Sequence, residues 1–299
     1  MSSVQLNLSI DNDSISPSIE IGAFEALWSI RENNISSFKQ LRERLNASDS
    51  KLPSDLIDLK TAQDFYQKAV SRLKESGITN FGIKIDGTID FPQKLQDADY
   101  PLALLYYMGN WDLIFTRGVS VVGTRNPSQD GIKRTKKLVK ALVSSGFTIF
   151  SGLAKGIDTT AHQAAIDSEG QTVAVLGTPL YMAYPRENKK LYDKIASEHL
   201  LISQVPVVSY ETKDIRFNRI FFPERNKTMS ALSEATIIVE AGETSGSLIQ
   251  AKAALKQNRK VFILNNNFEN PALSWPEKLL EAGAFRVHEI DDILLELQK

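Results

Sequence analysis

Small turn-forming residues and cations recur directly after short apolar runs in this sequence. The run GVSVV (118–122) is followed by Gly123 and Arg125, and the run FTIFS (147–151) is followed by a turn that ends at Asp158. Backbone N–H groups at such turns bind anions well when a helix begins behind them. An arginine adds planar, bidentate donation to phosphate. The pattern therefore predicts turns that hold phosphate groups.

The turn after the second run combines two glycines, a hydroxyl and a lysine. Its spacing matches neither the G-x-G-x-x-G fingerprint nor a Walker A loop, so no cofactor is predicted. By composition it is still an anion-binding turn at a helix start. The residues concerned are Ser151, Gly152, Lys155, Gly156 and Asp158.

Catalysis at this turn is the weaker of two hypotheses. Ser151 as a nucleophile would need His162 as its base. His162 follows Asp158 by four residues on one face of a predicted helix, which favours a structural hydrogen bond between them. Asp158 is also expected to cap that helix. We therefore predict no catalytic residue.

Two later segments, FPERNK (222–227) and EAGETSGSL (240–248), carry similar chemistry ahead of predicted helices. Hydroxyls and free N–H groups at a helix start either bind phosphate or serve as an ordinary N-cap. One such turn would hold a mononucleotide, whereas several around one groove suit a polyphosphate or a strand of nucleic acid. The candidate residues are Arg225, Asn226, Lys227, Ser245, Gly246 and Ser247.

Two features leave alternatives open. Tyr184, on a turn with Pro185, either stacks on a base or packs against the protein. The helix predicted near 131–145 carries a run of cations that forms either a solvated face or an extension of the phosphate surface. These cations are Lys133, Arg134, Lys136, Lys137 and Lys140.

Composition narrows the class of protein. The 299 residues have a net charge of -1, which excludes a globally basic nucleic-acid binder. Residues 101–165 nevertheless carry eight basic and three acidic side chains, a local charge of +5. The chain has no cysteine, which excludes disulfides and thiolate zinc sites, and its three histidines leave little material for another metal site.

The same sequence predicts no membrane partner and a cytoplasmic location. It contains no apolar run of about 18 residues that would span a membrane. The N-terminus, MSSVQLNLSI, lacks a basic start followed by an apolar stretch, so no secretory signal is expected.

Two regions differ in their periodicity. Apolar residues recur at helical spacing over 16–77, which predicts a small helical domain over 1–77 with residues 1–15 disordered or loosely attached. Over 78–299 short apolar runs alternate with helices, which predicts a parallel sheet with right-handed crossovers. The segment 204–222 has no clear period and is predicted to be a long surface loop. The expected strands are 118–124, 147–151, 171–177, 236–240, 260–264 and, more weakly, 199–203.

Five blocks together resemble the DprA (Smf) family in order and spacing, from about Phe91 to Ala284. The blocks are VVGTRNPS, GFTIFSGLAKGIDTTAHQAA, TVAVLGTPLYMAYPRENKKL, FPERNKTMSALS and EAGETSGSLIQAKAAL. The resemblance implies an α/β fold: a Rossmann-like, doubly wound, mostly parallel sheet preceded by the helical domain.

The resemblance also implies a function. Members of the family bind single-stranded DNA, protect incoming DNA during natural transformation and load a RecA-type recombinase; they are typically homodimers without an established catalytic activity. Cations and turn amides would hold phosphates, which contact every sequence alike. The implied DNA- and phosphate-binding residues are Gly123, Arg125, Ser151, Gly152, Lys155, Gly156, Asp158, Arg225, Asn226, Lys227, Ser245, Gly246 and Ser247.

Some positions depart from the family pattern. Lys155 and Lys227 stand where arginines are usual, which keeps the charge but loses bidentate geometry. Asn265, Asn266 and Asn267 replace a common Pro-Gly turn, and the C-terminal winged helix of many members is not expected. These changes indicate a divergent member.

Two alternatives use the same kind of pocket. A nucleotide hydrolase of the wider superfamily would carry a PGGxGTxxE segment, whereas this chain has EAGETSGSL (240–248). A sensor of a nucleotide-derived small ligand is not distinguished by sequence, because one phosphate-binding turn looks alike for a monomer and a polymer.

Overall fold

The N-terminal region is helical, as predicted. The computed structural model describes residues 15–48, 51–98 and 100–298, so the disorder expected over 1–15 lies outside the described residues except for Ile15. The Ser37 hydroxyl caps the second helix by accepting the Gln40 N–H at 3.2 Å, and Gly77, at φ +82°, follows the end of the third. The helices are α1 (Pro17–Ser29), α2 (Phe38–Ala47) and α3 (Leu59–Glu75).

The rest of the chain is built on one mixed sheet. In the described part of the chain its strand order is β1-β2-β6-β5-β4-β3-β7-β8-β9. β2 pairs antiparallel with both neighbours, and the remaining neighbours in this order pair in parallel, which confirms the mostly parallel sheet. The strands are β1 (Gly82–Ile85), β2 (Leu104–Gly109), β3 (Gly118–Val122), β4 (Thr148–Ser151), β5 (Thr172–Leu176), β6 (Leu200–Ser203), β7 (Ala235–Ile238), β8 (Lys260–Leu264) and β9 (Phe285–Val287).

The strand order reverses beside β3. From β3 the chain adds β4, β5 and β6 on one side, and then returns to place β7, β8 and β9 on the other. In an open α/β sheet, the crevice outside the carboxyl ends of the strands at such a switch point is where ligands bind. The topology therefore predicts a ligand site at the loops that follow β3 and β7.

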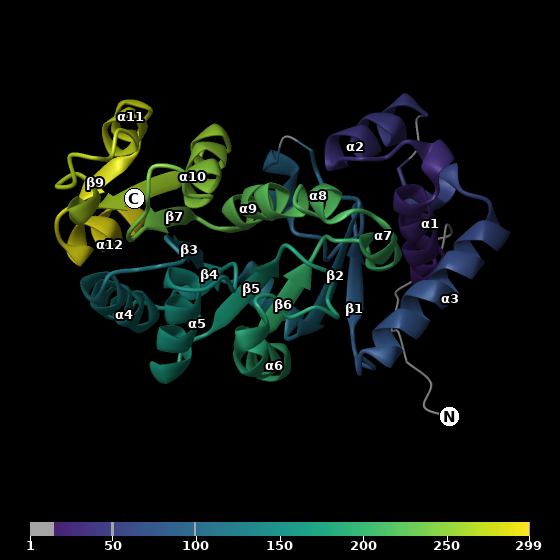
Figure 1. Cartoon of the computed structure of the whole chain (residues 1–299), viewed down its shortest axis with the longest axis horizontal. Helices are drawn as coiled ribbons and strands as arrows, with labels where there is room; N and C mark the ends of the chain where they lie inside the picture. Colours follow the sequence, from purple (N-terminus) through teal and green to yellow (C-terminus); the bar gives the residue numbers. More distant parts are fainter. Residues whose placement is uncertain (1–14, 49–50, 99, 299) are drawn as a thin grey trace.

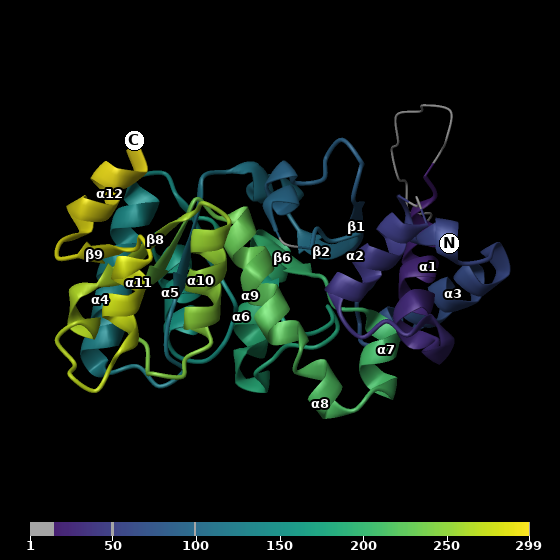
Figure 2. The ribbon, with the colours of Figure 1, turned by 90° about the horizontal axis from the view of Figure 1, so that it is seen from above.

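Helices cover both faces of this sheet (Figures 1 and 2). Residues Val119 and Val121 of β3 pack into one core with α4, α5 and α12, whereas Val122 joins a second core with α9 and α10. The alternation is that of a strand buried on both faces, and it confirms the doubly wound arrangement. The helices are α4 (Gln129–Ser144), α5 (Ile157–Asp167), α6 (Lys189–Glu198), α9 (Phe221–Leu232), α10 (Ser247–Lys256), α11 (Trp275–Glu281) and α12 (Ile290–Gln298).

Two parts of the sequence-based prediction are wrong or incomplete. The segment 204–222 is not a surface loop, because it forms α7 (Val207–Thr212), α8 (Ile215–Asn218) and the start of α9. α7 and α8 have six and four residues, too few to display a helical period in the sequence. Strands β1 and β2 were not predicted, and they extend the sheet toward the N-terminal helices (Figure 1).

A buried carboxylate joins the N-terminal helices to the sheet. Glu25 of α1 is fully buried, and its Oε1 accepts hydrogen bonds from the Tyr106 hydroxyl at 2.6 Å and the Val207 N–H at 2.7 Å. Its Oε2 accepts the Val208 N–H at 2.8 Å. The helices and the sheet thus share one core, and the predicted boundary between residues 77 and 78 stays a prediction.

Replacing Glu25 by glutamine is expected to remove a pH dependence of stability. Burial raises the pKa of Glu25 from 4.5 to about 7, although three donors favour its charged form. Because the folded pKa is the higher, the carboxyl group stabilises fully below its unfolded pKa, and this stabilisation is lost as the pH rises through about 7. Relative to Glu25→Gln, the wild type should lose about 1–3 kcal/mol of unfolding free energy from pH ~5 to ~8.

Denaturant unfolding of both proteins across this pH range measures the difference. Glu43→Gln on α2, which removes an exposed carboxylate paired with Lys39, is the control for loss of a surface charge. A constant difference between the wild type and Glu25→Gln would contradict the prediction.

No helix in the described ranges is both long enough and apolar enough to span a membrane.

Candidate nucleic-acid interface

A polar crevice lies at the carboxyl ends of β3, β4 and β7, at the switch point of the sheet. Its volume is about 500 Å³, and α9 and α10 supply its remaining wall. We call it the switch-point crevice. The predicted site residues that line it are Gly123, Arg125, Asp158, Arg225, Asn226, Ser245, Gly246 and Ser247.

Arg125 places an exposed cation in the crevice lining. The loop that carries it is held at Thr124, whose N–H donates to Glu240 O at 2.7 Å and whose O accepts the Ile157 N–H at 3.2 Å. No hydrogen bond or ion pair of the Arg125 side chain occurs within the described residues. Its guanidinium is thus available to a ligand.

Asp158 holds the turn after β4, whereas the sequence predicted it to cap α5. Its buried Oδ2 accepts the Gly152 N–H at 3.1 Å and the Ala154 N–H at 3.4 Å. Burial raises the pKa of Asp158, and the charge of Arg225 opposes that rise. The N-cap of α5 is Gly156, at φ +80°, where an added Cβ would lie 2.4 Å from Thr124 O.

Arg225 is a buried part of the crevice lining and supports the same turn. Its Nη1 donates to Gly152 O and to Val175 O, both at 2.6 Å, and its Nε donates to Asn226 Oδ1 at 2.9 Å. A Cβ on Gly152 would lie 2.0 Å from this Nη1, so a larger residue there would displace the guanidinium from its two carbonyls. Burial lowers the pKa of Arg225, while Asp158 opposes that change. The Nη1 and Nε donors of Arg225 are therefore engaged by the protein itself.

The α10 end of the crevice is lined by hydroxyls at a helix start. Ser245 and Ser247 share a hydrogen bond of 2.7 Å between their Oγ atoms, and α10 begins at Ser247. Asn226 reaches across from α9 and donates to Gly246 O at 3.1 Å. These contacts bring together two segments that lie about twenty residues apart in the sequence, and they face the helix start toward the crevice.

The other predicted residues do not line the crevice. The Ser151 hydroxyl is buried and donates to Val121 O at 2.8 Å. Lys155 forms an exposed ion pair with Glu187. Lys227 pairs with Glu224 at 2.6 Å and lines a separate cavity of about 250 Å³. Gly152 and Gly156 shape the turn by the close approaches described above.

Ser151 and His162 do not form the hydrogen bond between nucleophile and base that the serine–histidine hypothesis requires. His162 is fully buried and shares a hydrogen bond of 2.7 Å from Nδ1 to the Thr172 hydroxyl, while Ser151 bonds to a strand carbonyl. Burial lowers the pKa of His162 to about 3, which keeps the ring neutral. The alternative Asp158–His162 bond is also not formed, because Asp158 faces the turn amides.

Aromatic and amide side chains that were not assigned to the site line it as well. Phe222 lines the crevice, and its ring centroid lies 5.6 Å from that of Tyr184, whose residue is 47% exposed. Gln250 reaches the crevice from α10, three residues after Ser247. Gln250 could have been predicted from its helical spacing, because it lies three residues after Ser247 and so on the same face of the helix. In the described residues, no group of three or more histidine and acidic side chains is placed to hold a metal ion.

Comparison with known proteins agrees with this fold. A family model described as DNA recombination-mediator protein A matches residues 84–298. The chain is 36% identical to the DNA processing protein DprA of Bacillus subtilis over 239 residues, which cover 79% of this chain and 77% of that protein. It is 44% identical to the Smf protein of Synechocystis over 182 residues, 60% of this chain but 44% of that longer protein.

Two solved structures are similar over most of their length. The Streptococcus pneumoniae DprA structure has a TM-score of 0.71 and 29% identity, and the match covers 92% of this chain and 97% of that one. The Helicobacter pylori DprA structure, solved for its single-stranded DNA binding mode, has a TM-score of 0.63 and 27% identity. The match covers 73% of this chain and 96% of that one. The chain therefore belongs to the DNA recombination-mediator protein A family, the family of the DprA and Smf proteins.

Proposed function

We propose that this protein binds single-stranded DNA with backbone phosphates in the switch-point crevice. The observation that carries the proposal is the crevice itself, in which an exposed Arg125 faces the serine-rich start of α10. A cation and a helix N-terminus are complementary to phosphate. The Helicobacter pylori relative, which is described as binding single-stranded DNA, supports the same assignment.

Aromatic side chains favour a single strand over a duplex. Tyr184 and Phe222 form a contacting pair beside the crevice, and the Tyr184 ring is half exposed. Unpaired bases stack on such rings, whereas the bases of a duplex are already stacked on one another. Phosphate contacts combined with stacking give binding that tolerates most sequences.

Family membership supports a proposal for the wider role. We propose that the protein is a cytoplasmic, homodimeric recombination mediator that protects incoming DNA and loads a RecA-type recombinase, without catalysing a reaction. The site residues named from the sequence belong to this proposal. So does the division into a helical unit over 1–77 and a Rossmann-like unit over 78–299.

Equilibrium binding of a ~30-nucleotide strand, titrated across salt and compared with a duplex of equal length, tests the proposal. We expect the single strand to bind more tightly. Its log affinity should fall linearly with log salt, with a slope of about -0.7 for each phosphate neutralised. Failure to bind the strand at low salt would reject the proposal.

A small nucleotide is the second candidate ligand, because the crevice volume of about 500 Å³ is typical of a small-molecule site. The protein would then be a sensor of a nucleotide-derived ligand, or a nucleotide hydrolase. Saturable binding of a nucleoside monophosphate without strand binding would favour the sensor. Release of free base from that nucleotide would favour the hydrolase.

A further inference from the structure

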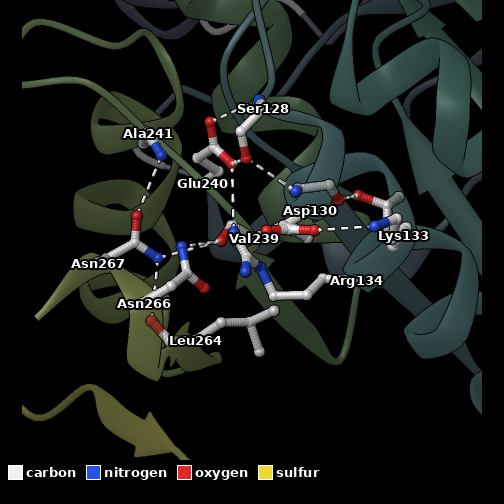
Figure 3. Close-up of polar contacts among 12 residues, drawn as sticks. Ser128, Asp130, Lys133, Arg134, Val239, Glu240, Ala241, Leu264, Asn266 and Asn267 are labelled. Carbon is white, nitrogen blue, oxygen red and sulfur yellow. Dashed lines mark hydrogen bonds and ion pairs between the residues drawn. The ribbon is translucent and has the colours of Figure 1, made fainter. Parts of the chain in front are cut away.

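A second polar cavity adjoins the switch-point crevice on the far side of the loops after β3 and β7. Its volume is about 340 Å³, and it shares Thr124 and Gly242 with the crevice lining. Its other polar side chains come from α4, the end of β7 and the turn after β8 (Figure 3). We call it the asparagine cavity, because Asn266, Asn267 and Asn270 line it.

Asn267 has a structural task at the wall of this cavity. Its Nδ2 donates to Val239 O at 3.1 Å and to Leu264 O at 3.0 Å, and its Oδ1 accepts the Ala241 N–H at 3.1 Å. The side chain is buried, and these bonds join the ends of β7 and β8. Both polar atoms of Asn267 are thus engaged by the protein.

Asn265 and Asn266 differ from Asn267 and from each other. Asn265 turns to the surface, where its Nδ2 donates to Glu269 at 2.6 Å and its Oδ1 accepts from Arg286 at 2.8 Å. Asn266 donates from Nδ2 to Val239 O at 3.1 Å, but its Oδ1 is buried and has no hydrogen-bond partner in the described residues. A buried acceptor without a partner costs free energy that a ligand donor would recover.

An unpaired donor approaches the same cavity from α4. Arg134 Nη2 lies 3.4 Å from Glu240 Oε2, while its buried Nε has no hydrogen-bond partner within the described ranges. Figure 3 shows Arg134 and Asn266 reaching toward the same space beside Glu240. The residues that line the cavity thus include one unpaired donor and one unpaired acceptor, both buried.

Glu240 adds a second acceptor. Its Oε1 accepts the Ser128 N–H at 2.9 Å and its Oε2 accepts the Ser128 hydroxyl at 2.6 Å. A carboxylate offers about four lone-pair directions, so Glu240 retains capacity for a further donor beside Arg134. Its negative charge also disfavours a second phosphate here, which separates this cavity chemically from the switch-point crevice.

We propose that the asparagine cavity binds a guanine base of the DNA strand whose phosphates lie in the switch-point crevice, an inference that rests on the proposed function. The Watson–Crick edge of guanine carries one acceptor, O6, next to two donors, N1–H and the N2 amino group. O6 would accept from Arg134, and the two donors would face Asn266 Oδ1 and Glu240. Thymine and cytosine carry a single donor position on that edge, and adenine carries one donor beside one acceptor.

The connection between the two cavities favours a base within a strand over a free nucleotide. Thr124 and Gly242 line both cavities, so the asparagine cavity adjoins the crevice in which we place the phosphates. A single base contact of this kind would add a local preference to binding that is otherwise independent of sequence.

The test compares a ~20-nucleotide thymidine strand with the same strand carrying one central guanine, and with one carrying adenine. The wild type should bind the guanine strand about tenfold more tightly than either of the others. Asn266→Leu should abolish this ratio, since Val239 O keeps its bond from Asn267 and the fold is preserved. Asn265→Leu, the neighbouring and matched substitution, should leave the ratio intact.

Arg134→Met is an independent variant. It should also abolish the preference for the guanine strand, even if the lost charge lowers the affinity for every strand. Equal affinity of the wild type for all three strands would overturn the guanine assignment while leaving the proposed function standing. Failure to bind any strand would reject both. Tighter binding of guanosine monophosphate than of the guanine strand would assign the cavity to a free nucleotide instead. Thermal melting of each variant confirms that it is folded.

Discussion

Replacing Arg225 by methionine is expected to lower the free energy of unfolding by about 2–4 kcal/mol. The substitution leaves Gly152 O and Val175 O without the Nη1 donor that each has at 2.6 Å. It also removes the positive charge that offsets the burial of Asp158. Part of the loss is offset because the Arg225 guanidinium is itself desolvated, which is why its pKa is lowered.

Guanidinium chloride unfolding at fixed pH measures this effect. Lys227→Met is the matched control two residues along α9, because Lys227 forms a partly exposed pair with Glu224 that is worth less than about 1 kcal/mol. If Arg225→Met costs no more than Lys227→Met, Arg225 is not the support of the turn after β4 and is free to contact a ligand.

Replacing Arg125 by alanine is expected to weaken single-strand binding by about 10- to 100-fold at low salt. A hydrogen bond between charged groups contributes about 1.5–3 kcal/mol, which corresponds to that range. Arg125 is exposed in the crevice lining, so its removal should affect the ligand more than the fold. The slope of log affinity against log salt should become less steep by about 0.7 for each phosphate that the variant no longer neutralises.

The control lies at the opposite end of the same strand. Arg117 precedes β3 and pairs with Glu234 at 2.8 Å, away from the carboxyl ends of the strands. Arg117→Ala should leave both the affinity for the strand and its salt slope unchanged. An equal loss of affinity in the two variants would mean that the basic side chains act through overall charge rather than through the crevice.

Local patterns in the sequence were sufficient for most of the elements. The strands β3, β4, β5, β7 and β8 are short apolar runs bounded by turns, and such runs are buried wherever they pair. α7 and β2 were missed for a different reason. α7 is too short to show a period. β2 is a short apolar run that was not assigned as a strand, and its antiparallel partner β6 lies almost a hundred residues away.

The candidate site was likewise predicted only in part from the sequence. The residue types after β3, β4 and β7 predicted anion-binding turns, and parallel strands bring their carboxyl ends to one edge of the sheet. The structure accordingly places Arg125, Asp158 and Ser245 around one crevice. Both arginines line the crevice, but Arg225 is buried and Arg125 is exposed, and sequence spacing could not separate them.

Propensity and periodicity act over a few neighbouring residues, so they were enough to predict a parallel sheet alternating with helices, the helical start and the positions of the polar turns. Which polar groups are free to bind a ligand depends instead on the folded chain. Arg225 Nη1 donates to the carbonyls of Gly152 and Val175, and Asn267 Nδ2 donates to that of Val239. The Arg125 side chain and the Asn266 oxygen have no hydrogen-bond partner among the described residues. Burial and hydrogen-bond partners come from segments far apart in the chain, and these segments meet only once the sheet has formed.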